Sequence, residues 1–139
     1  MTAGELMRPN CPALAERSTL RQACGLLARS GLPAVPVRGA GGLLLGSITM
    51  GGLLSALASD ADRSAPVADL MDRFPAAVLT YAHTESILAE MDEAGLWALP
   101  VVDGENRLVG LVSLSNLAGV VSAPLLAQAW NNLGEFQNG

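Results

Sequence analysis

The chain repeats itself at a fixed spacing. Residues 3–59 align without a gap on the residues 64 positions further along. Matched positions carry similar side chains in the same order, such as Gly31 with Gly95, Pro36 with Pro100, and Thr49 with Ser113. A fixed period of this length indicates two copies of one supersecondary unit. Small duplicated modules more often bind than catalyse, so the repeat weighs against an enzyme.

Composition limits the functions open to the chain. The 139 residues are 50% hydrophobic, which is enough for a sizeable core. The net charge is −5 and all eight basic residues are scattered arginines. Duplex nucleic acid needs clustered positive charge, so it is not an expected partner, whereas one or two arginines suffice for a small phosphorylated ligand. No apolar run approaches the roughly 20 residues of a membrane helix, so we expect a cytoplasmic protein with no direct membrane insertion.

Catalytic and metal-binding motifs do not emerge from the sequence. His83 is the only histidine, and it aligns with Thr19 at the start of a predicted helix. A lone histidine can form neither a histidine metal centre nor a Ser-His-Asp arrangement without further partners. Cys11 and Cys24 lie too far apart for a CxxC pair, and we expect both to be reduced. The sequence therefore predicts no enzyme, no required cofactor and no metal site.

The hydrophobic period changes in the same order within each copy. The first copy predicts a helix after Thr19 that ends at Gly31, strands over 34–37 and 43–49 around a glycine-rich hairpin, and a helix over 51–58. The second predicts a helix over 83–95, strands over 99–102 and 108–113 around an Asp-Gly turn, and a helix over 114–121. We divide the chain into a first motif (1–59), a linker (60–66), a second motif (67–122) and a helical tail (123–139). The tail carries an apolar stripe that we expect to dock with Trp130 buried.

These residues resemble a known family. The segment AGLWALPVVDGENRLVGLVSLSNL, residues 94–117, is similar to the cystathionine β-synthase (CBS) domain, and the whole chain resembles a tandem pair, or Bateman module. The resemblance implies an α+β fold in which two β-α-β-β-α motifs pack with pseudo-twofold symmetry. It also implies a homodimer, for which we expect the helices over 51–58 and 114–121 to form the faces. The expected ligands are AMP, ADP, ATP or S-adenosylmethionine, each acting as a regulatory ligand rather than a required cofactor.

The resemblance also implies where a ligand would bind. The family's ribose-binding signature is Ser/Thr-x-x-Asp at the junction of the returning strand and the last helix. The second copy has Ser113 and Asn116 there, and an amide accepts a hydroxyl hydrogen bond more weakly than a carboxylate. The first copy has Thr49 and Gly52, so its ribose contact is lost. Trp97 precedes and Pro100 opens the strand over 99–102 beside the expected cleft, and the Trp97 indole is a candidate to stack on adenine.

Two functions remain open at this point. One is a regulatory module that senses an adenosyl ligand through Ser113, Asn116, Pro100, Trp97 and Thr49. The other is a ligand-free structural or dimerisation module with degenerate nucleotide sites, for which Gly52 and the alanines at 13 and 77 argue. The phrase over 87–113 is similar to CBS pairs that follow membrane-embedded site-2 metalloproteases, so this second reading includes the cytosolic part of such a protease. Ser113 and Thr49 are expected to cap helices in either case.

Overall fold

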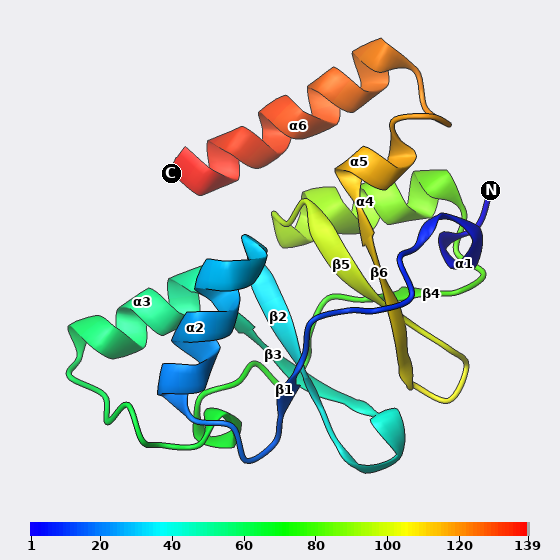
Figure 1. Cartoon of the computed structure of the whole chain (residues 1–139). Coiled ribbons are helices and arrows are strands. Elements are labelled where there is room, and N and C mark those ends of the chain that lie inside the picture. Colours follow the sequence, from blue (N-terminus) through cyan, green and yellow to red (C-terminus); the bar gives the residue numbers. More distant parts are fainter. Residues whose placement is uncertain (139) are drawn as a thin grey trace. The chain divides into compact units, whose positions relative to one another are not determined.

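The computed structural model describes Met1–Asn138 and places these residues in two compact units. Unit 2 is the continuous segment Pro12–Pro75, and unit 1 joins Met1–Cys11 to the chain from Ala76 onward. Each unit contains a three-stranded sheet with helices packed beside it (Figure 1). The expected α+β class is confirmed. The compact units and the sequence repeats thus divide the chain at different points.

Unit 2 is built from the first repeat. Strand β1 (Leu14–Ala15) runs parallel to β2 (Ala34–Arg38), and β2 pairs antiparallel with β3 (Leu44–Thr49). Helix α2 (Leu20–Ser30) connects β1 to β2, and α3 (Met50–Ala58) follows β3. The hairpin between β2 and β3 contains a 3-10 turn over Ala40–Gly42. This order is the β-α-β-β-α motif that the family resemblance implies, including the short leading strand β1 that the hydrophobic pattern does not predict.

Unit 1 repeats the motif with the second repeat. Strand β4 (Val78–Leu79) is parallel to β5 (Ala98–Val102), which pairs antiparallel with β6 (Leu108–Ser113). Helix α4 (Thr84–Ala94) joins β4 to β5, and α5 (Leu114–Leu117) follows β6. Two further helices belong to this unit, α1 (Ala3–Leu6) and α6 (Ala123–Asn138). Both hairpins shift register by one residue at matching places, between Val37 and Arg38 and between Val101 and Val102.

Local sequence signals explain the helix ends. The backbone amide of Gln22 donates to the Thr19 hydroxyl at 3.2 Å, and the Thr19 amide donates back to the Gln22 side chain at 2.9 Å. This reciprocal pair is a capping box. Helices α2 and α4 end at Gly31 and Gly95, which have φ of 67° and 68°. Glycine tolerates this left-handed conformation, so the matched helices end at matched residues.

Helix α5 is shorter than the sequence predicts. It ends at Leu117 instead of continuing to residue 121. The next residues include Gly119 and Val120, and both glycine and β-branched side chains weaken a helix. Ser122 then begins a new helix, because its backbone carbonyl accepts from the Leu126 amide at 3.0 Å. The predicted single helix over 114–121 is therefore a short helix followed by a turn, and α6 begins after it at Ala123.

The leading segments of the two repeats are exchanged between the units. The Ala3 amide at the start of the first repeat donates to the Ala82 carbonyl of the second at 2.8 Å. The corresponding Val67 amide donates to the Ser18 carbonyl at 2.7 Å. Each sheet is thus completed by a segment that precedes the other repeat in sequence. Sequence reasoning missed this exchange because the period fixes which residues match but not which copy each segment packs against.

Two matched glycines make room for the exchanged segments. A Cβ on Gly46 of β3 would lie 2.5 Å from the Asp72 carbonyl oxygen, and one on Gly110 of β6 would lie 2.6 Å from that of Arg8. Real Cβ atoms do not approach backbone oxygens so closely. Glycine at these positions is therefore required by the close approach of the segment that bridges to the strand.

The tail helix α6 packs on α4 and α5 of unit 1 (Figure 1). Leu133 is only 1% exposed and joins the core with Ile87 and Met91 of α4. The expectation that the tail docks is confirmed for its own unit, but the expectation that Trp130 is its buried anchor is wrong. Trp130 is 54% exposed, since it lies on the side of α6 that overlooks an open cavity rather than the core.

Candidate ligand-binding site

Ser113 and Asn116 meet at the junction of β6 and α5. The Ser113 amide donates to Asn116 Oδ1 at 2.9 Å, and the Ser113 hydroxyl donates to the same oxygen at 3.1 Å. The Ser113 and Ser115 hydroxyl oxygens lie 2.8 Å apart. Ser113 is 8% exposed, so this cluster sits at the edge of the core. Asn116 caps its own helix here, and a ligand hydroxyl would have to share or replace these hydrogen bonds.

The matching junction in unit 2 is simpler. The Thr49 hydroxyl accepts from the Gly52 amide at 3.0 Å and so caps α3. Gly52 offers no side chain where Asn116 stands in the other unit. Both repeats thus have a hydroxyl residue before the last helix, Thr49 and Ser113. Only the second repeat has a polar side chain three residues later, that of Asn116.

A hollow opens beside Thr49. Its volume is about 140 Å³. It is lined within unit 2 by two hydroxyl residues, one carboxylate and three other residues, namely Ser47, Thr49, Asp72, Ile48, Gly52 and Leu70. An engineered protein cavity of about 150 Å³ holds a benzene-sized molecule, so the hollow suits a single ring such as a ribose. The apolar residues provide surface for the ring, and the hydroxyl and carboxylate groups provide hydrogen-bonding partners.

Asp72 enters this hollow on the exchanged segment. Its amide donates to the Ser47 carbonyl and its carbonyl accepts from the Ser47 amide, both at 2.9 Å. Its carboxylate accepts from the Phe74 amide at 2.9 Å. The sequence analysis missed Asp72 because nothing in the local sequence links it to a strand that precedes it by 25 positions in the chain.

The same backbone bridge in unit 1 carries an arginine. The Arg8 amide donates to the Leu111 carbonyl at 2.8 Å, and the Leu111 amide donates back to the Arg8 carbonyl at 2.9 Å. Arg8 aligns with Asp72 and Leu111 aligns with Ser47 in the repeat. Arg8 therefore stands beside β6 as Asp72 stands beside β3, with the opposite charge.

Pro100 and Trp97 are placed differently from each other. Pro100 lies within β5, paired with Leu111 of β6. Trp97 precedes β5, and its carbonyl accepts from the Leu114 amide at 3.0 Å. The indole lines a cavity together with residues of α5 and α6, and this cavity includes Ser115 but neither Ser113 nor Asn116. Thr49 belongs to the other unit.

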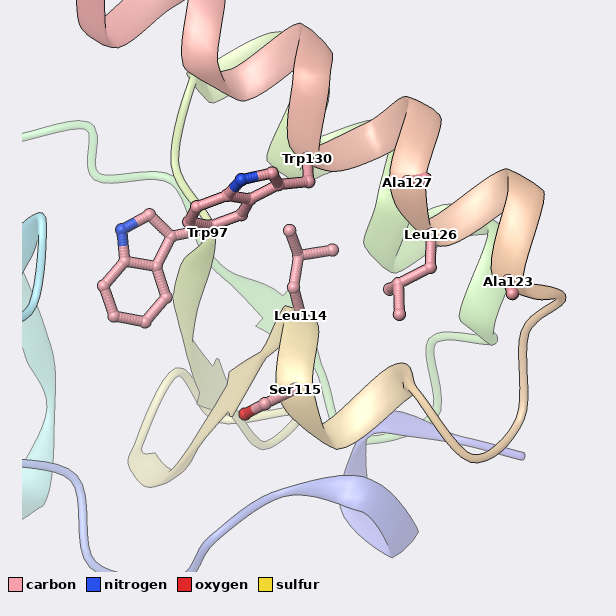
Figure 2. Close-up of a pocket in the computed structure, with 7 residues that line it drawn as sticks. All are labelled: Trp97, Leu114, Ser115, Ala123, Leu126, Ala127 and Trp130. Carbon is pink, nitrogen blue, oxygen red and sulfur yellow. The ribbon is translucent and has the colours of Figure 1, made fainter.

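The cavity at Trp97 is open and almost entirely apolar. Its volume is about 530 Å³. Figure 2 shows Leu114 pointing from α5 toward α6 and Trp130 reaching from α6 toward Trp97. The Ser115 hydroxyl is the one side-chain polar group of its lining apart from the two indole N–H groups. Such a surface suits an apolar side chain and offers little to bind ribose hydroxyls or phosphates.

The pKa shifts lie away from the candidate sites. The Thr2 backbone amide donates to Glu5 at 3.0 Å and lowers the pKa of its carboxyl. The Arg107 backbone amide likewise lowers the pKa of Asp103 in the second hairpin. Across Met1–Asn138, no group of three histidine, cysteine or acidic side chains is placed to hold a metal ion. None of the described helices combines the length and apolarity needed to cross a membrane.

The fold and its junctions define a class of protein, a duplicated α+β module with matched strand-to-helix junctions. Comparison with protein families gives the particular family. The sequence model of the CBS domain family matches residues 3–59 and 67–123. The chain therefore belongs to the CBS domain family and carries a tandem pair, which confirms the resemblance found in the sequence.

Individual proteins resemble this chain at low sequence identity. The chain is 28% identical over 121 residues to a homoserine O-acetyltransferase of Methanocorpusculum labreanum, covering 85% of this chain but only 24% of that protein. It is 25% identical to CBSX2, solved in complex with AMP, with a TM-score of 0.72 over 91% of this chain and 98% of that one. A CBS domain pair solved with 5′-methylthioadenosine and S-adenosyl-L-methionine is 18% identical, with a TM-score of 0.72 over 86% and 94% of the two chains. At 18% identity this last likeness shows the fold alone.

Proposed function

We propose that this CBS pair is a regulatory module that binds an adenosyl ligand and controls an attached or partner protein without catalysing a reaction. The observation that carries the proposal is the Ser113–Asn116 cluster. It holds a hydroxyl and an amide oxygen at the junction where the family places its ribose contact. The AMP complex of CBSX2 and the methylthioadenosine and S-adenosylmethionine complex of the other pair support this ligand class.

The nucleotide is expected to bind in an asymmetric way. The amide oxygen of Asn116 accepts hydrogen bonds from the Ser113 amide and hydroxyl, so the same oxygen is oriented and available to a ribose hydroxyl that replaces the serine hydroxyl. Gly52 provides no such acceptor in unit 2. A hydrogen bond to a charged acceptor exceeds one to a neutral acceptor by roughly 1 kcal/mol, so Asn116 weakens nucleotide binding about five- to ten-fold relative to an aspartate.

A calorimetric titration with AMP, ADP, ATP and S-adenosylmethionine is the direct experiment. We expect one nucleotide site per chain in the wild type. Asn116→Ala should remove it, and Asn116→Asp should tighten it by about five- to ten-fold, because the acceptor becomes charged. Gly52→Ala is the matched control from the other repeat and should leave nucleotide affinity unchanged.

Two outcomes would contradict the proposal. If none of the four ligands binds at millimolar concentration, the chain is the ligand-free structural module instead. If two equal sites appear, the argument from Asn116 and Gly52 fails. Since Asn116 also caps α5, the melting temperature of each variant separates a loss of binding from a loss of fold.

The chain is also expected to form a homodimer, but through one of the two helices that the sequence predicts for the contact. Helix α6 packs on α5, so its own chain already covers part of the face expected over 114–121. In unit 2, α3 still exposes Met50 and Leu54, which are 38% and 58% exposed. In unit 1 the matching helix α5 packs against α6 of the same chain. In a symmetric dimer, a second copy of α3 would supply the apolar helix that α3 lacks in its own unit. We therefore assign the dimer contact to α3.

Light scattering at micromolar concentration measures this directly. Leu54→Glu places a charge at the centre of the α3 face and should give a monomer. Leu125→Glu is the control, because Leu125 is a 43% exposed leucine on α6, outside the proposed contact. A wild-type monomer, or equal effects of the two variants, would contradict the assignment.

A further inference from the structure

The two units carry opposite charges at the same place in the fold. Asp72 bridges to Ser47 of β3 and lines the hollow at Thr49. Arg8 makes the matching bridge to Leu111 of β6, two residues before Ser113. We propose that these two residues sort adenosyl ligands by charge. The hollow of unit 2 takes an uncharged or cationic adenosyl ligand, and the junction of unit 1 takes a phosphorylated one. This inference rests on the proposed function, since it presumes that adenosyl ligands bind at all.

The backbone fixes both charges close to their junctions. Each bridge consists of two backbone hydrogen bonds of 2.8–2.9 Å, and the neighbouring glycines, Gly46 and Gly110, let the segments approach the strands. Neither segment can withdraw without breaking these bonds. The backbone of each bridging residue is therefore held beside its strand, and the Asp72 side chain lines the hollow. We infer that the charge of each residue acts on a ligand bound at its junction.

Neighbouring side chains leave both charges available. The ion pairs within the described part of the chain are those of Arg107 with Asp103 and Glu105, far in sequence from either bridge. The Arg73 guanidinium, adjacent to Asp72, donates to the Ala68 carbonyl at 3.1 Å. The Asp72 carboxylate accepts from the Phe74 backbone amide and forms no ion pair within the described part of the chain. A ligand that enters the hollow thus meets an unneutralised carboxylate.

The shape of the hollow agrees with a ligand that lacks phosphate. Its volume of about 140 Å³ suits one ring. A phosphate attached to a ribose in this space would come close to the Asp72 carboxylate and be repelled, whereas a sulfonium would be attracted. Unit 2 has no side-chain acceptor for ribose at Gly52, and the carboxylate of Asp72 lines the hollow instead.

Three probes with the same adenosine and different 5′ charge test the inference. AMP carries an anionic group, 5′-methylthioadenosine carries none, and S-adenosylmethionine carries a sulfonium cation. In calorimetry on the whole chain, we expect AMP to occupy one site and methylthioadenosine another, without competition. Asp72→Asn should lower the affinity for S-adenosylmethionine roughly ten-fold, as expected for losing one charge pair a few ångströms away near a protein surface. It should weaken methylthioadenosine less, because that ligand carries no charge at its 5′ end and loses only the difference between a charged and a neutral hydrogen-bond acceptor.

The variants are chosen to preserve the fold. The asparagine oxygen of Asp72→Asn can still accept from the Phe74 amide, so the turn is kept. Arg8→Gln is the matched variant of the other repeat, and it should weaken AMP roughly ten-fold while leaving the other two probes unchanged. Both effects should shrink at 1 M salt, where the screening length is about 3 Å.

The possible failures are distinct. If Asp72→Asn changes all three affinities equally, or none, while AMP still binds the wild type, the charge-sorting inference is overturned and the proposed function stands. If AMP and S-adenosylmethionine compete for a single site, the assignment of two ligand classes to two units is overturned. If no probe binds the wild type, both the inference and the proposed function fail.

Discussion

Replacing Leu133 by alanine tests how the tail helix is held. Leu133 is 1% exposed and packs in the core of unit 1, whereas Leu125 of the same helix is 43% exposed. The two substitutions remove identical atoms from one helix and have the same effect on helix propensity. The difference between them therefore reports burial alone.

The magnitude follows from the atoms removed. Leu→Ala deletes three carbons, worth about 0.8 kcal/mol each when fully buried, or about 2.4 kcal/mol, and the cavity left behind adds to this. We expect Leu133→Ala to lower the free energy of unfolding of unit 1 by about 3 kcal/mol. Leu125→Ala leaves no enclosed cavity and should cost at most about 1 kcal/mol.

Urea unfolding followed by circular dichroism measures both variants, and a chain ending at residue 122 gives the limit in which α6 is absent. If the free energies of unfolding of the two leucine variants fall equally, or if neither changes, then α6 is not held through Leu133. A Leu133→Ala protein that behaves like the truncated chain would mean that this one side chain accounts for most of the docking.

Three other predictions rest on close approaches and surface charges. Gly110→Ala should lower the free energy of unfolding by at least about 2 kcal/mol, because its Cβ would meet the Arg8 carbonyl oxygen at 2.6 Å. Gly51→Ala is the control, because a Cβ there would have no other atom within 4 Å, and it should be neutral or slightly stabilising in the same denaturation assay. Trp130→Ala should change the intrinsic fluorescence but cost less stability than Leu133→Ala, since its indole is half exposed. The pKa of the Asp103 carboxyl is lowered in the folded state, so the stability it contributes is present above its ordinary pKa near 4 and is lost as the pH falls below that value; Asp103→Asn should flatten that part of a stability–pH curve.

Much of the fold was predictable from the sequence because it depends on local signals. The cap at Thr19 and the left-handed glycines at 31 and 95 fix the helix ends without reference to the rest of the chain. The Asp-Gly turn was predicted at the right place, although the residue with positive φ is Asn106 (62°) and not the glycine. Such features require only neighbours in sequence, and the repeat supplied each of them twice.

The candidate site was predictable only in part. The contact between Ser113 and Asn116 follows from their spacing at a helix start. The hollow beside Thr49 does not, because it needs Asp72 from a segment that reaches the strand through the exchange of leading segments. The side on which Trp130 faces also depends on how α6 sits on α4 and α5. These are tertiary relations, and a single sequence without an alignment contains no direct signal for them.

The repeat explains how one chain can hold two different sites on one scaffold. Positions where the bridging segment packs closely against a strand carry the same residue in both repeats. Gly46 and Gly110 are such a pair, because a Cβ there would push the bridging segment away in either unit. Positions that we propose to face a ligand differ between the copies, as with Asp72 and Arg8 or Gly52 and Asn116. Measuring the three adenosine probes on the Asp72→Asn and Arg8→Gln proteins therefore addresses both the sites and the reason that the copies differ.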